Sequence, residues 1–223
     1  MRIEPAPGGV RVEPLDDEIE PVVRQLLGFP FDLEGFRPQD TVLARLAERL
    51  RGLRPPLAPD PFEALVGSIT AQQVSLFAAF AVRNRFISRF GEQHGRAWSF
   101  PAAERVARAG EDELVALGFS RRKAEYVLGI ARAEVGWAEL ALLPDDDVKA
   151  RIVAVRGLGE WTADWFLARY LARPRAWPAG DLGLRKAVAA FYGPVEDVRA
   201  FGARFDPFQN LAAHYLLVGL RVP

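Results

Sequence analysis

The chain of 223 residues contains no cysteine, which excludes several kinds of site. Without thiols there is no disulfide, no thiolate zinc site and no cysteine-bound iron–sulfur cluster. His94 and His214 are too few for a histidine-rich metal site. No apolar run approaches the roughly 20 residues of a membrane-spanning helix, and the first residues lack the pattern of a signal peptide. We therefore expect a cytoplasmic protein with no membrane partner and no required cofactor. We also expect a monomer.

The chain also lacks a net charge, because 29 basic residues offset 29 acidic ones. The distribution is uneven, however. Residues 151–223 carry 10 basic and 6 acidic side chains, whereas residues 1–60 carry 8 and 11. Local patches rather than net charge govern binding to phosphates. The basic C-terminal third fits either a nucleic-acid surface or ordinary solvated helix faces.

Alternation of apolar and polar residues, typical of strands, is almost absent. The first 17 or so residues are the exception, and they predict a short strand or an irregular arm. Elsewhere helix signals repeat: Asp60-Pro61-Phe62-Glu63 has the form of a capped helix start, and Ser75 is expected to cap a helix that runs to about Phe90. The fold class is therefore predicted to be all-α.

The segment VAVRGLGEWTA, residues 153–163, predicts two helices joined by a tight turn. Gly157 and Gly159 permit positive φ and close approach of the backbone, and Leu158 between them is expected to pack inward. The free amides at the start of the second helix form an anion site that suits phosphate. A plain corner between helices gives the same pattern, although the adjacent Arg151 and Arg156 favour phosphate.

Two tryptophans and one aspartate follow this turn. Trp161 and Trp165 lie four residues apart and share a helix face, which is typical of a core stripe. Asp181 stands where a further helix begins, the usual place of a capping residue. A helix N-terminus also favours a carboxylate, because the helix dipole is positive there.

These features together resemble the 3-methyladenine DNA glycosylase II family of the helix-hairpin-helix glycosylases. The resemblance covers about residues 20–220. It depends on FEALVGSITAQQVS (62–75), on LGFSRRKAEYVLGIA (117–131), on the hairpin, and on an aspartate twenty residues beyond Trp161. Any one of these motifs is weak alone, but four in this order are specific.

The resemblance implies a particular domain organisation. Residues 1–19 are expected to form an arm or a remnant, because the family's N-terminal β domain is absent or vestigial here. Residues 20–223 are expected to form the glycosylase core, with the active-site cleft between two helical subdomains. About residues 60–165, including the hairpin, form the central subdomain, and residues 20–59 join residues 166–223 in the second.

The resemblance also assigns roles to single residues. Asp181 becomes the catalytic carboxylate, and the base pocket is lined by Trp161, Trp165, Tyr215 and Leu217. Double-stranded DNA with alkylated bases is the expected partner, and the residues implied in binding it are Gln72, Gln73, Arg156, Gly157, Leu158 and Gly159. Gln73 in particular is expected to fill the gap that the extruded nucleotide leaves. The backbone carbonyls of Val153, Val155 and Leu158 would hold a monovalent cation.

The expected activity is that of a monofunctional glycosylase, which flips out 3-methyladenine and related N-alkylated bases and hydrolyses the glycosidic bond. Bifunctional relatives carry a lysine about where Trp161 stands, and without that amine no Schiff base forms with the sugar. Two alternatives remain at this point. One is a glycosylase for oxidised or mismatched bases, and the other is a noncatalytic helix-hairpin-helix protein that binds DNA.

Overall fold

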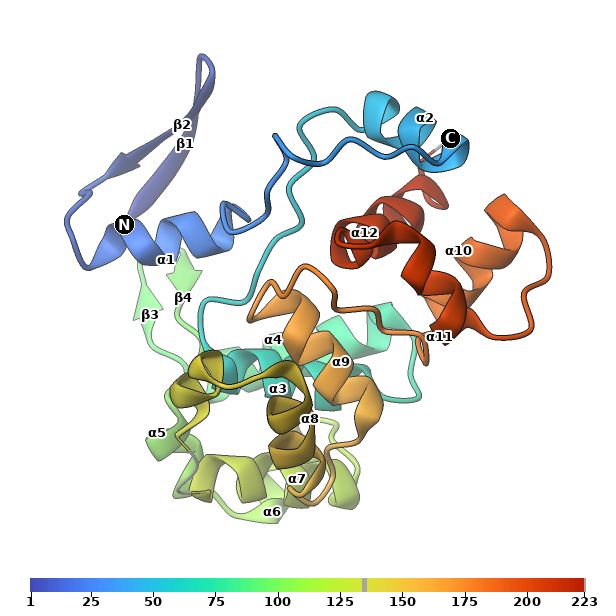
Figure 1. The fold of residues 1–223 in the computed structure, drawn as a ribbon. Helices are drawn as coiled ribbons and strands as arrows, with labels where there is room; N and C mark the ends of the chain where they lie inside the picture. The colour runs from blue at the N-terminus through green and yellow to red at the C-terminus, as the bar shows by residue number, and fades with distance from the viewer. Residues whose placement is uncertain (134–135, 223) are drawn as a thin grey trace.

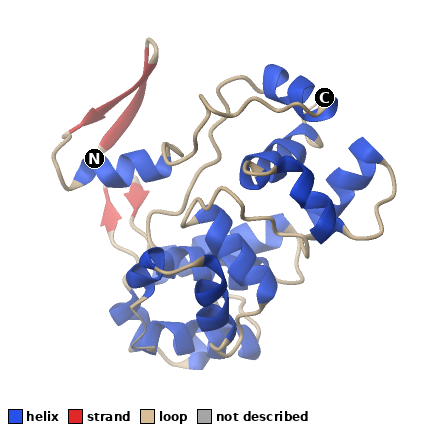
Figure 2. Ribbon diagram, in the orientation of Figure 1, coloured by secondary structure: helices blue, strands red, loops and turns tan. Residues whose placement is uncertain are grey.

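A computed structural model describes residues 1–133 and 136–222, and nearly all of its regular structure is helical (Figures 1 and 2). The longer helices are α1 (Ile19–Leu26), α2 (Thr41–Arg49), α3 (Pro61–Ala71), α4 (Leu76–Phe90), α7 (Arg121–Arg132), α8 (Asp145–Val153), α9 (Glu160–Arg169), α10 (Leu182–Tyr192) and α12 (Gln209–Gly219). The short ones are α5 (Ala103–Ala107), α6 (Glu111–Ala116), α11 (Val198–Phe201) and the 3-10 helices η1 (Trp137–Leu142) and η2 (Gly202–Phe205). The predicted all-α class is confirmed.

The helix starts follow from local sequence. The Asp60 carboxylate accepts a hydrogen bond from the Glu63 amide at 2.9 Å, and Pro61 occupies the first turn. Ser75 caps α4 through the Ala78 amide at 3.2 Å. Each cap satisfies an amide that the helix itself leaves without an acceptor. Both predicted caps are confirmed.

The helices form two groups that meet at α9. In the first group, α3 packs against α4, α7 and α9, α7 contacts α5 and α6, and α8 contacts α9. In the second, α12 packs against α2 and α10 (Figure 1). Helix α9 continues through the expected boundary between residues 165 and 166, so that boundary falls inside a helix rather than in a linker.

The N-terminal arm is an antiparallel hairpin of β1 (Arg2–Ala6) and β2 (Gly9–Glu13), drawn in dark blue in Figure 1. The predicted strand in this region is therefore confirmed, with a partner strand added. A second pair, β3 (Gln93–His94) and β4 (Ala97–Trp98), joins α4 to the next helices. The sequence did not predict this pair, because two-residue strands leave no alternation to detect.

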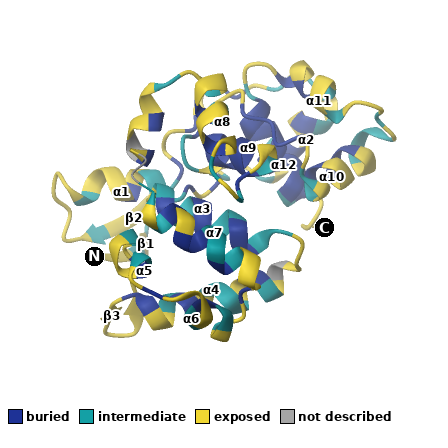
Figure 3. Ribbon diagram, turned by 90° about the horizontal axis from the view of Figure 1, so that it is seen from below, coloured by how far each residue is buried: buried dark blue, intermediate teal, exposed yellow. Residues whose placement is uncertain are grey.

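The core runs through both groups, and α9 and α12 are its most enclosed helices (Figure 3). Every residue of α9 from Thr162 to Ala168 is buried. The glycine turn at residues 157–159 leads directly into α9, so this turn is anchored to a rigid, buried helix. Among the described residues, no helix has both the length and the apolar character needed to cross a bilayer.

Candidate active site

The glycine turn between α8 and α9 is shaped by contact with α7. Gly157 has φ +92°, and a Cβ atom built there would lie 2.2 Å from the Tyr126 ring. Only glycine fits this position without displacing the ring. Leu158 is buried, as predicted, and its amide donates to the Val155 carbonyl at 3.0 Å.

Gly159 differs from Gly157, because its backbone is extended and its missing Cβ would meet open space. It is the N-cap of α9 and offers no side chain to the helix amides. Among the described residues, the backbone amides of Gly157, Gly159 and Trp161 donate no hydrogen bond to the backbone. This turn therefore presents free donors to an exposed surface, the geometry of an anion site.

The arginine next to the turn is only partly available for phosphate. Arg156 is exposed and forms an ion pair with Glu125 at 3.0 Å. Such surface ion pairs contribute little free energy, so this one holds Arg156 only weakly. Its predicted role in DNA binding stays a prediction.

Asp181 and the two predicted tryptophans converge on one point. The indole Nε1 of Trp161 donates to Asp181 Oδ2 at 3.0 Å, and that of Trp165 donates to the same oxygen at 3.1 Å. Oδ1 accepts from the Leu184 amide at 2.9 Å and so caps α10. The capping interpretation of Asp181 is confirmed, and the same carboxylate is oriented by two indoles. Three neutral donors thus hold a negative charge at one position.

This carboxylate lies on the wall of a cavity of about 380 Å³ between the two helix groups. A site of this volume suits a small molecule or a single nucleobase. The cavity walls come from the end of α1, the segment before α3, α3, α4, α9, the start of α10 and the end of α12. The charged and aromatic residues among them are Glu63, Phe80, Arg83, Trp161, Trp165, Arg169, Asp181 and Arg221, and Leu217 adds an apolar side chain. Leu217 stands in the wall, at the position predicted for it.

Tyr215 does not line this cavity, so its predicted place in the pocket is wrong. Its side chain is buried on another side of α12, where its hydroxyl donates to the Leu53 carbonyl at 3.1 Å and its ring packs against Phe36. Two residues that lie two apart on a helix point about 200° apart. Because Leu217 faces the cavity, Tyr215 must face away from it.

The two glutamines of the loop after α3 point in different directions. Gln72 is half-buried, and its amide nitrogen donates to the Gly157 carbonyl at 3.4 Å, which links the loop to the hairpin. Gln73 is exposed and has φ +55°, an unusual value for a residue other than glycine. This placement leaves the Gln73 side chain available to an outside partner. The predicted insertion into DNA stays a prediction.

A lysine that the sequence did not single out holds this loop. Lys123 Nζ donates to the carbonyls of Thr70 at 3.1 Å and of Gln72 at 2.7 Å. A cation at the C-terminal end of α3 is favoured by the helix dipole. Burial lowers the pKa of the Lys123 amine. Its only sequence signal is that it follows Arg121 and Arg122 in a run of three basic residues.

Sequence reasoning also missed Arg169 and His214, which surround Trp165. The Arg169 guanidinium lies 4.2 Å from the centre of the Trp165 ring, while His214 meets that ring edge-on at 5.8 Å. Burial lowers the pKa of His214 to about 3, and the nearby Arg169 adds to the effect. A neutral histidine therefore packs against Trp165, with its Nδ1–H donating to the Asn210 carbonyl at 2.9 Å. Nothing in the sequence spacing connects these residues.

On the far wall, Glu63 and Arg83 form an ion pair that joins α3 to α4. Burial raises the pKa of the Glu63 carboxyl, and the Arg83 charge opposes that shift. Glu63 was singled out only as part of a helix start. The structure adds that it also borders the cavity.

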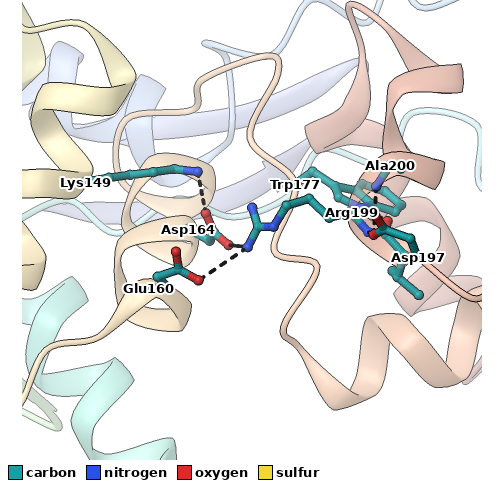
Figure 4. A network of polar contacts seen from close by, with 8 residues as sticks. Lys149, Glu160, Asp164, Trp177, Asp197, Arg199 and Ala200 are labelled. Atoms are coloured by element: carbon teal, nitrogen blue, oxygen red, sulfur yellow. Dashed lines mark hydrogen bonds and ion pairs between the residues drawn. The ribbon is translucent and has the colours of Figure 1, made fainter.

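A second carboxylate on α9 is neutralised by its neighbours. Asp164 is buried and forms ion pairs with Lys149 at 2.7 Å and with Arg199 at 3.4 Å, and Arg199 reaches Glu160 at 3.7 Å (Figure 4). The network connects α8, α9 and α11. Asp164 is absent from the lining of the cavity.

The described residues contain no cluster of three histidine or acidic side chains that could hold a metal ion. The backbone carbonyls predicted to hold a monovalent cation are a different kind of site. Val153 ends α8 and is exposed, and the Val155 carbonyl accepts the Leu158 amide, which leaves it a second lone pair. The donor set is compatible with a hard cation, and the cation itself stays a prediction.

The chain is similar in sequence to a family of DNA repair proteins and to individual glycosylases. Residues 66–200 match the family described as HhH-GPD superfamily base excision DNA repair protein. The chain is 33% identical over 190 residues to the DNA-3-methyladenine glycosylase of Bacillus subtilis (strain 168), a match that covers 79% of this chain and 63% of that protein. The chain thus spans a little less than two thirds of the length of this relative.

Two further similarities cover larger shares of the related protein. DNA-3-methyladenine glycosylase 2 of Escherichia coli (strain K12) is 31% identical over 208 residues, which are 87% of this chain and 71% of that protein. The solved structure of a 3-methyladenine DNA-glycosylase from Archaeoglobus fulgidus superposes with a TM-score of 0.81 at 30% identity. It covers 95% of this chain and 78% of that one.

Proposed function

The chain belongs to the HhH-GPD superfamily of base excision DNA repair proteins, and we propose that it is a monofunctional DNA glycosylase for alkylated bases. Its substrates are 3-methyladenine and related N-alkylated bases in duplex DNA. One observation carries the proposal: the Asp181 carboxylate, oriented by the indoles of Trp161 and Trp165, stands on the wall of a cavity of the right size for a base.

The chemistry follows from the position of this carboxylate. An N-alkylated purine is often cationic and leaves readily, so the reaction needs little help from a general acid. As the glycosidic bond breaks, positive charge develops at the anomeric carbon of the sugar. Asp181 stabilises that charge directly or activates the attacking water. Because its oxygens accept hydrogen bonds only from neutral groups and the nearby Arg169 makes no ion pair with it, its charge can act on the sugar.

Recognition of the base relies on charge and aromatic surface. Indole is the most favourable aromatic surface for a cation, at about 0.5–2 kcal/mol per contact. The Arg169 guanidinium already lies over the ring of Trp165, whereas Trp161 is only half-buried. We therefore assign Trp161 the closer contact with a cationic base.

The hairpin supplies the contact to the DNA backbone. Free amides at Gly157, Gly159 and Trp161 receive one phosphate, and Gln73 fills the gap in the duplex. A monovalent cation on the carbonyls of Val153, Val155 and Leu158 would add positive charge near that phosphate. All these residues and the cavity belong to one chain, in keeping with a protein that works as a monomer.

The absence of a suitable amine favours the monofunctional reaction. Trp161 occupies the position at which bifunctional relatives are expected to carry lysine, and its indole is bound to Asp181. Lys186, on α10, is exposed and lies outside the cavity lining. The product is therefore an abasic site in an intact strand.

The test is release of free bases from methylated duplex DNA, with wild type compared with Asp181→Asn. Asparagine also caps a helix, but its NH2 group cannot accept from the two indoles as Asp181 Oδ2 does, so the folding of the variant is checked by circular dichroism and thermal unfolding. We expect wild type to release 3-methyladenine without nicking the strand. The variant should bind DNA but release the base about 100- to 1,000-fold more slowly.

Other outcomes would overturn parts of the proposal. Release of oxidised or mismatched bases alone would assign the site to a different glycosylase. Binding without release by wild type would make the chain a noncatalytic DNA-binding protein. An Asp181→Asn variant as active as wild type would place the catalytic residue elsewhere.

A further inference from the structure

Two aromatic side chains on α4 are exposed to an extent that no packing role explains. Phe77 is 85% exposed and Phe80 is 57% exposed. They lie three residues apart and are therefore neighbours on the helix surface. Farther along α4 the exposed residues are polar, namely Asn84, Arg85, Ser88 and Arg89. The apolar surface is thus confined to the first two turns of the helix.

This aromatic pair lies between two parts of the site. Phe80 lines the cavity that contains Asp181. Phe77 lies one turn closer to the start of α4, only a few residues after the exposed Gln73. Phe77 and Phe80 therefore lie on one helix surface between the exposed loop and the cavity, and we call this pair of rings the aromatic track.

The size and setting of the track favour a nucleobase over a protein partner. Two buried phenylalanines contribute at most about 500 Å², whereas a stable protein interface buries about 800 Å² per partner. A base that leaves the duplex loses its stacking partners. An aromatic ring replaces them, because every base has a flat face that stacks on such rings.

We propose that Phe77 and Phe80 form a stacking track for the extruded base of the damaged strand. Phe77 receives the base as it leaves the duplex, and Phe80 takes it into the cavity. This inference rests on the proposed function and adds the route by which the base reaches Asp181. The track lowers the cost of unstacking and therefore acts before bond cleavage.

The experiment separates stacking from simple apolar contact through three variants, Phe77→Ala, Phe77→Leu and Phe77→Trp. Base extrusion is followed by the fluorescence of 2-aminopurine placed beside a methylated base, in the Asp181→Asn background so that no base is cleaved. Single-turnover release of the alkylated base is followed with Asp181 present. Leu142→Ala, at an 87% exposed residue of η1 outside the cavity lining, is the matched control.

We expect Phe77→Ala to reduce both extrusion and single-turnover release about tenfold. Phe77→Trp should restore both, Phe77→Leu should resemble Phe77→Ala, and Leu142→Ala should resemble wild type. Affinity for undamaged duplex should change less than twofold in all four variants.

The proposal is wrong if Phe77→Ala extrudes the base as wild type does, or if Phe77→Leu restores full extrusion. It is also wrong if Phe77→Ala weakens binding to undamaged duplex as much as it slows extrusion, because Phe77 would then be a general DNA contact. If wild type is a dimer in sedimentation velocity and Phe77→Ala is a monomer, the two rings form a protein interface and the proposal is wrong as well. Failure of the proposed function would look different. In that case wild type releases no base, whereas the fluorescence signal still reports whether Phe77 assists extrusion.

Discussion

Two aspartates interact with α9 in opposite electrostatic surroundings: Asp164 belongs to the helix, and Asp181 accepts hydrogen bonds from two of its tryptophans. Asp164 has 3% of its side chain exposed and is held between the cations of Lys149 and Arg199 (Figure 4). Asp181 is held by two indoles and one backbone amide, all of them neutral. No lysine, arginine or histidine of the described chain lies within ion-pair distance of Asp181, and Arg169 acts on its charge only from farther away.

The difference separates a structural carboxylate from a reactive one. The charge of Asp164 is neutralised by its partners, so it connects three helices and has little left to offer a substrate. The charge of Asp181 is oriented by neutral donors and has no ion-pair partner in contact with it, although the Arg169 charge acts on it from farther away, and it borders a cavity. Burial or hydrogen bonding alone would not distinguish the two residues. What distinguishes them is that the partners of Asp164 are cations, whereas the hydrogen-bond donors to Asp181 are neutral.

The largest expected effect comes from removing each charge in turn. Asp181→Asn should slow base release about 100- to 1,000-fold. Its single amide oxygen can accept from Leu184 or from the indoles but not from both, so the variant should also lose about 1–3 kcal/mol of unfolding free energy. Asp164→Asn should affect stability alone. Its release rate, measured below the unfolding transition, should stay within about threefold of wild type.

The cost of Asp164→Asn should appear in urea unfolding as a loss of about 1–3 kcal/mol. This is less than the full cost of breaking a buried pair, because Lys149 and Arg199 are 34% and 52% exposed. Asp164→Asn with wild-type stability but a hundredfold slower reaction would contradict the comparison.

A smaller effect concerns His214, which packs behind Trp165. Its pKa is about 3 in the folded protein, against about 6.5 in the unfolded chain. The unfolded state therefore binds the additional proton, and stability is full above pH 6.5 and falls as the pH drops toward 3. At pH 5 the loss relative to pH 7 should be about 2 kcal/mol.

The measurement is urea unfolding at pH 7 and pH 5, with His214→Phe as the comparison. Phenylalanine keeps an aromatic ring against Trp165 and Phe31 but cannot take up a proton. The variant should lose most of the difference between the two pH values. An unchanged difference would show that other groups cause it.

The smallest effect tests the indole donors. Trp161→Phe and Trp165→Phe each keep an aromatic ring and remove one hydrogen bond to Asp181. Each should slow single-turnover release about tenfold, because a hydrogen bond to a charged group contributes about 1.5–3 kcal/mol and the remaining donors still hold the carboxylate. If both single variants react at the wild-type rate, the indoles do not orient Asp181.

Much of this site could be predicted from local patterns in the sequence. Asp60 and Ser75 were expected as helix caps, and Gly157 as a turn glycine, because those roles depend on a few neighbouring residues. The spacing of Trp161 and Trp165 placed both on one helix face. The resemblance then brought Asp181 to that face. These predictions depend on backbone geometry that the local sequence determines.

Other features required the tertiary structure. Tyr215 and Leu217 are both buried and lie two residues apart on α12, and only the rotation of that helix in the fold decides which one faces the cavity. Sequence spacing likewise cannot show that Lys149 and Arg199 neutralise Asp164 while Asp181 meets only neutral donors. The sequence by itself determined the helices, their caps and the order of the motifs, because these follow from short-range sterics and hydrogen bonding. Only the packing of distant helices decided which charges are cancelled and which side chains border the cavity, because Coulomb interactions and burial depend on distances in space.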